Sequence, residues 1–467
     1  MSAFRLIRML VVLLGLIAAS ALPGVASGSA RVTDVVNAWP QYGQSAAHLN
    51  TNPAEQTLNP KNIPALQVAW TDHFGEVTND GTGPVTAGGI TYVTGDDGVL
   101  SAFKAGGCGA ATCEPIWRAR TPNGDSFPGT PAIAGKVVLV AATDHMVYAF
   151  PAAGCGKAVC GPAWTAPTAD TGWIFAVSGG VAYLGDFGGR LYAFATAGCG
   201  KPSCKPLWTW QGDGEQITTA PAVGGGSVFV GTTQNNVDPP SGRLVVLPAA
   251  GCGAQVCKPT WTADLEGPVR SFSPVVSGDT VFAGSDARFG VGDNPKPNLF
   301  AFPTRGCGAK VCKPLRSYDL GDTSSGGTPA VADGTVFVRT HSSPFGGFGV
   351  VLAFPAAGCG AAVCQPLWTG MAQSEGAESD PVVVGHMVLV AASPVIRPED
   401  FSFTGGIFAY STTPCGTSTC DPVAFLDLKT NGQNYISEPM AVANGQVMMV
   451  TEDADQRSLV YVLTAPK

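Results

Sequence analysis

The fourteen cysteines of this 467-residue chain fall into seven pairs, and four residues separate the two members of every pair. The first members of successive pairs stand 47, 44, 53, 55, 52 and 56 residues apart, which is the period of a β-propeller blade and not of a leucine-rich repeat. One supersecondary unit is therefore repeated along the chain. The pairs are Cys108/Cys113, Cys155/Cys160, Cys199/Cys204, Cys252/Cys257, Cys307/Cys312, Cys359/Cys364 and Cys415/Cys420.

The sequence around each pair repeats as well. A short apolar run such as Leu-Tyr-Ala-Phe at 191–194 precedes each pair, and two more β-branched runs separated by a glycine turn, as at 328–338, lie between pairs. Each repeat thus predicts four antiparallel strands, A to D, with the cysteines in the C-to-D turn. In five repeats a tryptophan stands nine residues after the first cysteine: Trp117, Trp164, Trp208, Trp261 and Trp368. Arg316 and Ala424 occupy this position in the other two repeats.

Two chemistries fit cysteines at this spacing. Structural zinc sites use pairs two to four residues apart, so one unit near a second could hold zinc. In an exported chain, an even set of cysteines at hairpin turns instead favours disulfides within each hairpin. The loop-entropy relation gives about 2 kcal/mol for each such bridge, so we expect the cysteines to stabilise the fold and not to perform chemistry.

The first residues predict export. Arg5 and Arg8 precede an apolar run that begins at Met9 and ends at Leu22, and small residues follow it. This pattern is typical of a secretory signal peptide, which we place at residues 1–30. The run is shorter than the ~20 residues that span a bilayer. An uncleaved membrane anchor is the alternative interpretation. We therefore expect a secreted or cell-envelope protein with no membrane span after cleavage.

Composition excludes several classes of protein. Glycine and proline account for 61 and 37 residues, which indicates many turns and an all-β fold. The chain has 26 Lys and Arg against 34 Asp and Glu, and without Arg5 and Arg8 the balance becomes 24 − 34 = −10. An acidic chain disfavours polyphosphate partners, so we expect no nucleic-acid binding.

The two ends of the chain complete one blade. Residues 66–70 predict a D strand with its tryptophan, Trp70, but no A, B and C strands precede it. Residues 439–463 predict A, B and C strands without a D strand. We therefore predict an eight-bladed β-propeller whose last blade joins both ends, which leaves no open sheet edge. Residues 31–65 would form an N-terminal arm and residues 66–467 the propeller.

These repeats resemble the pyrroloquinoline-quinone-like β-propeller repeat, over about residues 39–465. The segment Trp39-Pro-Gln-Tyr-Gly43, with the run at 58–70 behind it, is similar to the N-terminal arm of the eight-bladed members. The disulfide turn replaces the usual Asp-x-x-Thr-Gly-Lys turn of these repeats. The family includes quinoprotein alcohol dehydrogenases and non-catalytic envelope proteins, so the resemblance implies the fold more narrowly than the function.

The resemblance leaves two functions open. The quinone enzymes hold pyrroloquinoline quinone with a Ca²⁺ site of Glu, Asn and Asp, and commonly have a disulfide between adjacent cysteines. This sequence contains neither adjacent cysteines nor the haem motif Cys-x-x-Cys-His. We therefore expect a monomeric binding or scaffold module without a cofactor or a metal site. The alternative is a dehydrogenase of alcohols or sugars that depends on pyrroloquinoline quinone and Ca²⁺.

A ligand is expected where the D-to-A connections and the B-to-C turns share one face. Residues just before each A strand would line the channel rim there and could bind a polar small molecule, a glycan or a protein. A solvated polar rim without a ligand is the alternative. The candidate residues are Ser126, Trp173, Thr219, Arg270, Ser325, Glu378 and Tyr435.

Four phenylalanines form a second candidate surface. Phe345 and Phe348 lie in one long B-to-C insertion, and Phe401 and Phe403 lie in that of the next blade. Exposed together, they would form a patch for a protein partner. Folded back over the blade tips, they would only add to the core.

Overall fold

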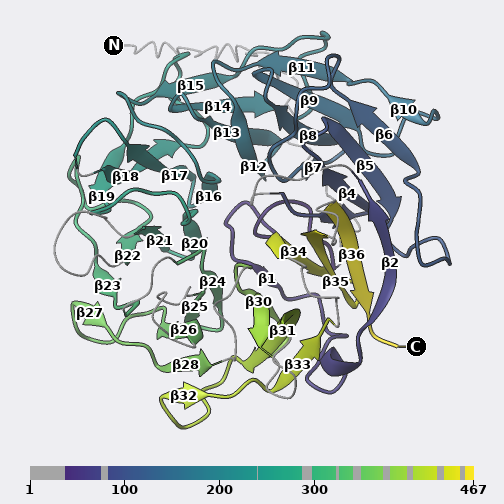
Figure 1. Cartoon of the computed structure of the whole chain (residues 1–467). Helices are drawn as coiled ribbons and strands as arrows, with labels where there is room; N and C mark the ends of the chain where they lie inside the picture. Colours follow the sequence, from purple (N-terminus) through teal and green to yellow (C-terminus); the bar gives the residue numbers. More distant parts are fainter. Residues whose placement is uncertain are drawn as a thin grey trace, which may run out of the picture. The chain divides into compact units, whose positions relative to one another are not determined.

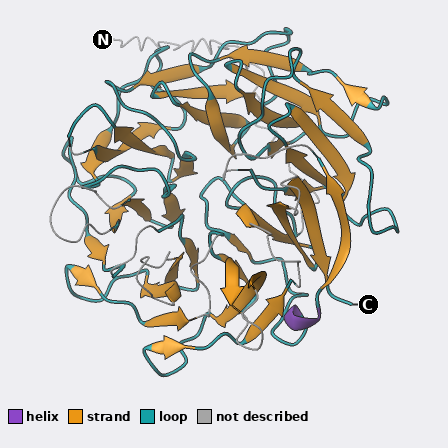
Figure 2. Ribbon diagram, in the orientation of Figure 1, coloured by secondary structure: helices purple, strands orange, loops and turns teal. Residues whose placement is uncertain are grey.

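Strands make up nearly all the regular structure (Figure 1, Figure 2). Each cysteine pair lies in a turn within one of the sheets that these strands form. The computed structural model describes residues 37–74, 82–238, 240–286, 297–321, 326–339, 349–371, 379–396, 403–428, 436–452 and 458–466. Within these ranges the chain forms eight four-stranded antiparallel blades, which confirms the predicted eight-bladed β-propeller. The predicted signal peptide lies outside the described residues.

Strands A to D follow one another along the chain in blades 1 to 7. Blades 1 to 4 comprise β3 (Val85–Ala87), β4 (Ile90–Thr94), β5 (Val99–Lys104) and β6 (Trp117–Arg120); β7 (Ala132–Ala134), β8 (Val137–Ala142), β9 (Met146–Pro151) and β11 (Trp164–Pro167); β12 (Gly172–Ser178), β13 (Val181–Asp186), β14 (Arg190–Ala195) and β15 (Trp208–Gln211); and β16 (Ala222–Gly224), β17 (Ser227–Gln234), β18 (Ser241–Pro248) and β19 (Trp261–Asp264). Blades 5 to 7 comprise β20 (Val275–Ser277), β21 (Thr280–Ser285), β22 (Asn298–Pro303) and β23 (Arg316–Tyr318); β24 (Ala330–Ala332), β25 (Thr335–Arg339), β26 (Gly349–Pro355) and β28 (Trp368–Met371); and β29 (Val382–Val384), β30 (Met387–Ile396), β31 (Phe403–Ser411) and β33 (Ala424–Asp427).

Blade 8 joins the two ends of the described chain. Its strands A to C are β34 (Ile436–Ala443), β35 (Gln446–Glu452) and β36 (Ser458–Thr464), and its strand D is β2 (Gln67–His73). The antiparallel register pairs Gln67 with Thr464 and His73 with Leu459, which confirms the predicted closure. Residues almost 400 positions apart in sequence therefore lie side by side. The facing edges of β2 and β36 are hydrogen-bonded to each other and are not open to another chain.

The repeated tryptophan packs between neighbouring blades. Trp70 of blade 8 is 1% exposed, and its ring centroid lies 5.2 Å from that of Phe103 in blade 1. Gly107, just before the first cysteine of blade 1, lies against the same indole with φ at +74°. A β-carbon on Gly107 would stand only 2.6 Å from Cδ1 of Trp70, so the turn needs glycine for both space and backbone conformation. The tryptophan is thus core, as its period predicts.

Every cysteine pair forms a disulfide within its own hairpin, which confirms the disulfide prediction over the zinc alternative. The Cα atoms of each pair lie 5.6–5.9 Å apart. Each hairpin also pairs with strand D of the preceding blade, which the cysteine spacing does not predict. β10 (Val159–Cys160) runs parallel to β6, β27 (Val363–Cys364) to β23 and β32 (Thr419–Cys420) to β28, and single bridges join Thr71 to Thr112, Thr165 to Ser203, Thr209 to Val256 and Thr262 to Val311.

Both cysteines of each pair lie in the C-to-D turn, as predicted, but their surroundings differ. The first cysteine is exposed, whereas the second is at most 7% exposed and belongs to the apolar core. The hairpin folds against the preceding blade, so the second cysteine shares an apolar cluster with an aromatic side chain of that blade's strand D. These clusters join Cys113 to Trp70, Cys160 to Trp117, Cys204 to Trp164, Cys257 to Trp208, Cys312 to Trp261, Cys364 to Tyr318 and Cys420 to Trp368.

The backbone of the buried cysteine holds it in that position. The N–H groups of Cys113, Cys204, Cys257 and Cys312 donate to strand-D carbonyls of the preceding blade, at 3.1, 2.7, 2.8 and 2.8 Å respectively. The accepting residues are threonines that directly follow the strand-D tryptophan, such as Thr71 after Trp70. The second cysteine therefore packs between blades as well as closing the bridge, which its sequence spacing does not reveal.

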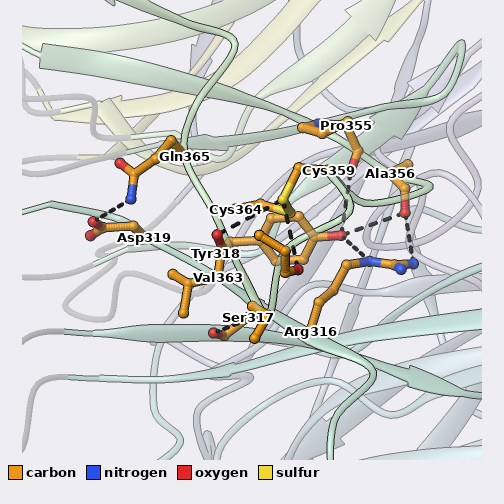
Figure 3. The surroundings of a disulfide bond; sticks show 12 residues. Arg316, Ser317, Tyr318, Asp319, Pro355, Ala356, Cys359, Val363, Cys364 and Gln365 are labelled. Carbon is orange, nitrogen blue, oxygen red and sulfur yellow. Dashed lines mark hydrogen bonds between the residues drawn. A yellow bond between two sulfur atoms is a disulfide. The ribbon is translucent and has the colours of Figure 1, made fainter.

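Each disulfide hairpin covers the outer edge of its neighbour. In Figure 3, Cys359 and Cys364 of blade 6 lie beside Ser317 and Tyr318 of blade 5. The N–H of Ser317 donates to the carbonyl of Ala362, and the N–H of Asp319 donates to that of Cys364, both at 2.9 Å. These bonds satisfy groups that an edge strand would otherwise leave open to another chain.

Blade 7 is covered differently, because strands C and D of blade 8, β36 and β2, are far apart in the chain and no hairpin joins them. The short 3₁₀ helix η1 (Ile63–Ala65) contacts β33 instead. Ile63 is fully buried and belongs to one apolar cluster with Leu58, Leu426 and Leu428. The arm thus supplies the cover that a disulfide hairpin supplies elsewhere.

Asp72 in the closing strand β2 gives a first testable prediction. It occupies the inward position that Ala119, Ala166 and Ala263 hold in other blades, and no hydrogen bond from the described residues reaches its Oδ2 atom. Burial and the nearby Glu114 raise the pKa of Asp72 to about 6. Because this value lies above that of an unfolded aspartate, folding favours the protonated form, and stability is lost as the pH rises from about 4 through about 6.

The variant Asp72→Asn is therefore expected to be about 1–2 kcal/mol more stable than the native chain at neutral pH and equally stable at pH near 4. Urea unfolding followed by tryptophan fluorescence at both pH values measures this difference. Asp421→Asn, which neutralises an exposed carboxylate, is the matched control and should change neither value. A gain in stability that is the same at both pH values would contradict the assignment.

Candidate functional site

The N-terminal arm runs along the channel and meets the innermost strand of each blade in chain order. β1 (Thr51–Asn52), which lies toward the centre of Figure 1, pairs in parallel with β29. The contacts from blade 1 to blade 8 join Trp39 to Thr86 (2.8 and 2.9 Å), Pro40 to Ile133 (2.8 Å), Gln41 to Val177 (2.7 Å), Ala46 to Val223 (2.6 Å), Ala47 to Val276 (2.9 Å), Leu49 to Val331 (3.0 Å), Asn50 to Val383 (2.8 Å) and Asn52 to Val442 (2.8 Å). Residues 39–52 thus bond to strand A of all eight blades.

A tight bend lets the arm complete this circuit. Gly43 adopts φ of +64°, and the N–H of Asn50 donates to its carbonyl at 3.2 Å. A β-carbon on Gly43 would stand 2.6 Å from the Cα atom of His48, so only glycine fits. The bend places the rings of Tyr42 and His48 edge to face, with centroids 5.2 Å apart.

Tyr42 reaches across the channel. Its ring packs with Ile174 and Ala220 of blades 3 and 4. Its hydroxyl donates to Oδ2 of Asp380 at 2.7 Å and lies 2.7 Å from Oγ1 of Thr328, and these two residues precede the A strands of blades 7 and 6. The tyrosine therefore links opposite sides of the ring through the channel.

Asp380, which accepts the hydrogen bond from Tyr42, also forms an ion pair with Arg339. Nε of Arg339, the last residue of β25, donates to Oδ1 of Asp380 at 3.3 Å, and the two side chains are only 12% and 3% exposed. Burial raises the pKa of Asp380, while the charge of Arg339 and the hydrogen bond from Tyr42 act in the opposite direction. A buried carboxylate with these partners holds its charge only while both remain in place.

The residues before the strand-A prolines bond one blade to the next. The N–H of Gly83 donates to Oγ1 of Thr130 at 3.0 Å, that of Ala220 to Oγ of Ser273 at 3.1 Å, and that of Ser273 to Oγ1 of Thr328 at 3.0 Å. The backbone of Thr328 in turn bonds to Asp380. Asp380 is therefore the acidic member of a repeated series whose other members are glycine, alanine, serine and threonine.

His48 is buried beside this network and is neutral. Burial lowers its pKa to about 4, although its Nδ1 atom lies 3.2 Å from the carbonyl oxygen of Pro274. A neutral ring with that contact donates from Nδ1, which leaves Nε2 as an acceptor with no partner among the described residues. His48 thus adds no charge to the channel.

The structure separates the rim residues that the sequence predicts. Trp173 packs against the cluster around Tyr42 and so joins the channel. Ser126 Oγ instead donates to Asp96 at 2.8 Å, and Arg270 donates to Asn235 at 3.0 Å; each acceptor lies in the B-to-C turn of the preceding blade. Thr219 is buried. Ser325, Glu378 and Tyr435 lie outside the described residues, and ligand binding by any of the seven stays a prediction.

The predicted aromatic patch cannot be placed. Phe345, Phe348 and Phe401 lie outside the described residues, and Phe403 begins β31 with its side chain outside them. Sequence reasoning also missed Tyr42, Arg339 and Asp380 as channel residues. A local signal existed for two of them: Arg339 is a charge at the end of an apolar strand, and Asp380 precedes a strand-A proline.

The two ends of the blades differ in charge. The end that carries the D-to-A connections and the B-to-C turns has numerous carboxylates in blades 1 to 5, together with the exposed Arg120 and Arg270. Some of its carboxylates cap backbone groups, as Asp286 Oδ2 does for the N–H groups of Arg270 and Ser271. Five are exposed to solvent, although two of them, Asp97 and Asp264, also accept hydrogen bonds from the N–H groups of Val99 and Glu266: Asp97, Asp213, Asp238, Asp264 and Glu266. We call these five residues the acidic end.

Two further features are absent from the described residues. These residues contain no group of three or more His, Cys, Asp or Glu side chains that could hold a metal ion. Among the same residues, no helix has the length and apolar character needed to cross a bilayer.

Comparisons with known proteins agree on the architecture. The family model described as outer membrane protein assembly factor BamB matches residues 65–293. BamB from Moraxella catarrhalis superposes with a TM-score of 0.53 at 13% identity, covering 85% of this chain and 97% of that chain. Quinohemoprotein alcohol dehydrogenase from Comamonas testosteroni superposes with a TM-score of 0.59 at 14% identity, covering 92% and 81%.

A third solved structure, also a quinohemoprotein alcohol dehydrogenase, superposes as well. Quinohemoprotein alcohol dehydrogenase ADHIIG from Pseudomonas putida HK5 gives a TM-score of 0.54 at 13% identity, covering 92% of this chain and 80% of that chain. A sequence search of curated proteins finds no match. Identities this low show a shared fold and not a shared activity.

Proposed function

This chain is an eight-bladed β-propeller of the pyrroloquinoline-quinone-like repeat family, and from that premise we propose that it is an extracytoplasmic binding scaffold whose acidic end recognises a partner with cationic groups. The acidic end is the observation that carries the proposal. Its five exposed carboxylates come from blade 1, blades 3 and 4, and the connection from blade 4 to blade 5. The strands that flank these turns and connections hold the five carboxylates on one face, where their fields add.

The arm supports binding at an end of the ring. Residues 39–52 already occupy hydrogen-bonding groups on strand A of all eight blades. A partner therefore meets the blade ends and the loops between them, where binding residues are common. The channel network of Tyr42, Arg339 and Asp380 is buried and holds the scaffold together beneath that face.

Two observations support the extracytoplasmic location and a protein partner. Seven disulfides persist in oxidising compartments and are rare in the cytosol. The matched family is described as a factor for assembling outer membrane proteins, which is work done on other polypeptides.

The test measures binding of a fluorescent peptide rich in lysine and arginine at low salt, with an acidic peptide as the negative probe. The native chain should bind only the cationic peptide. Asp213→Asn with Asp264→Asn should weaken binding about fivefold, because each exposed charge contributes a fraction of a kcal/mol. Glu114→Gln with Asp421→Asn removes the same charge from the opposite end and should have no effect. Equal losses in both variants, or no binding, would overturn the proposal.

The second candidate function is oxidation of an alcohol or sugar by a bound quinone with Ca²⁺. The ion pair of Arg339 with Asp380 beside Tyr42 favours it, since a channel acid could accept a proton. The fit is nevertheless poor in the described residues, because they hold no three-donor metal cluster and Arg339 is already paired. We derive no catalytic step through the quinone. Stoichiometric quinone absorbance after incubation with quinone and Ca²⁺, followed by dye-linked alcohol oxidation, would establish this function instead.

A further inference from the structure

The disulfide hairpins of blades 2 to 5 are basic, although the chain as a whole is acidic. The segments 151–163, 195–207, 248–260 and 303–315 contain no Asp or Glu. Their six lysines are all exposed, and no ion pair within the described part of the chain involves them: Lys157, Lys201, Lys205, Lys258, Lys310 and Lys313.

The same hairpins expose large aliphatic side chains beside the lysines. Val256 is 60% exposed and Val311 is 64% exposed, and each stands just before the second cysteine of its hairpin. Leu207 and Leu315, which precede the D strands, are 51% and 54% exposed. Water-exposed valine and leucine at repeated positions of rigid hairpins form a surface and are not scattered single residues.

Topology gathers these residues at one end of the blades. Because the strands alternate in direction, every C-to-D turn lies at the end opposite the acidic end. Each hairpin also lies against the preceding strand D, as the bridge between Thr209 and Val256 shows, so Val256 of blade 4 comes next to the start of β15 in blade 3. Exposed lysines therefore lie at this end in blades 2 to 5, and the four aliphatic residues accompany them in blades 3 to 5. The exposed Asp279, in the A-to-B turn of blade 5, lies at the same end. We call these six lysines and four aliphatic residues the basic sector.

The chemistry of the basic sector favours a lipid surface over a protein. Protein interfaces are enriched in Arg, Tyr and Trp and depleted in Lys, because the planar guanidinium pairs with specific carboxylates. The four hairpin segments contain Arg305 and no aromatic residue. Lysines are compact charges that suit a layer of phosphate groups, and neighbouring valines and leucines suit the boundary between headgroups and acyl chains.

We propose that the basic sector docks the propeller on a bilayer that contains anionic phospholipid. The lysines face the phosphate groups, and the exposed valines and leucines enter the headgroup boundary. The acidic end, at the other end of the blades, is repelled by the same surface and so faces away from it. Docking in this orientation leaves the acidic end accessible.

The test is co-sedimentation of the full oxidised chain with vesicles. The native chain should bind mixed phosphatidylcholine and phosphatidylglycerol vesicles, should bind pure phosphatidylcholine weakly, and should be released by high salt. Lys258→Glu with Lys313→Glu should reduce the bound fraction about tenfold or more. Glu114, Gln365 and Asp421 occupy the same position in other blades, so the fold tolerates this change.

Two further variants separate the contributions. Lys61→Glu with Arg120→Glu changes the net charge equally outside the basic sector and should leave vesicle binding unchanged. Val256→Ser with Val311→Ser keeps the charge and should lower binding to the mixed vesicles severalfold. Equal binding to both vesicle types, equal effects of the two charge reversals, or competition by polyglutamate that exceeds the effect of matched salt would overturn the proposal and indicate an acidic protein partner. None of these results depends on peptide binding at the acidic end.

Discussion

Reduction of the seven disulfides is expected to lower the free energy of unfolding by on the order of 10 kcal/mol, the largest effect we predict for this chain. Each bridge closes a short loop and contributes about 2 kcal/mol by restricting the unfolded chain. The native state also loses order, because hairpins such as 359–364 hold hydrogen bonds to the preceding blade. Urea unfolding with and without a phosphine reductant, followed by tryptophan fluorescence, measures the change.

Single pairs provide the control for this experiment. Replacing Cys359 and Cys364 by alanine should cost about 2 kcal/mol and should increase amide exchange at Ser317 and Asp319 in the neighbouring blade. Exchange in blade 3 should not change, because it lies outside the two blades that this hairpin joins. Unchanged stability after complete reduction would show that the hairpins hold their neighbours without the sulfur bridge.

Loss of Arg339 is the second large effect. Arg339→Met leaves the carboxylate of Asp380 buried without its cation, which is expected to cost about 3–5 kcal/mol at neutral pH. The cost should shrink at low pH, because the pKa of Asp380, already raised by burial, rises further without Arg339 and the protonated acid needs no cation. Unfolding curves at acidic and neutral pH measure both effects.

The double variant keeps this prediction falsifiable. Arg339→Met with Asp380→Asn removes both charges and retains a side chain that can accept the hydrogen bond from Tyr42, so much of the lost stability should return. Tyr42→Phe alone should cost about 1–3 kcal/mol, because it removes a buried hydrogen bond to the carboxylate. If the single and double variants are equally unstable, the ion pair is not what joins the arm to blades 6 and 7.

The blades were predictable from the sequence because the contacts that form a blade join residues close together in the chain. Pairing of strands C and D needs only residues within one repeat. The period of Trp117, Trp164 and their equivalents reflects packing that recurs at most blade boundaries. The disulfides followed from the same periodicity. Closure by β2 and β36 was also predictable, since each end showed strands that the other lacked.

The candidate site was less accessible to prediction. Trp173 packs near the channel network, but Tyr42 and Asp380 are 338 residues apart and no spacing rule connects them. Nor does the local sequence of a hairpin show that it bonds to the preceding blade or that its second cysteine, such as Cys257, is buried there. A net charge of −8 also hides the basic sector, because acidic residues elsewhere in the chain, such as Asp213 and Asp264 at the other end of the blades, outnumber its lysines.

The sequence by itself determined the repeat, the number of blades, the disulfide pairs and the strand that closes the ring. Only the tertiary structure decided the path of the arm, the partners of Asp380 and the end at which each charge lies. The physical reason is that a strand or a hairpin turn is stabilised within a few residues, whereas the channel and the two ends exist only once eight separately encoded sheets stand side by side.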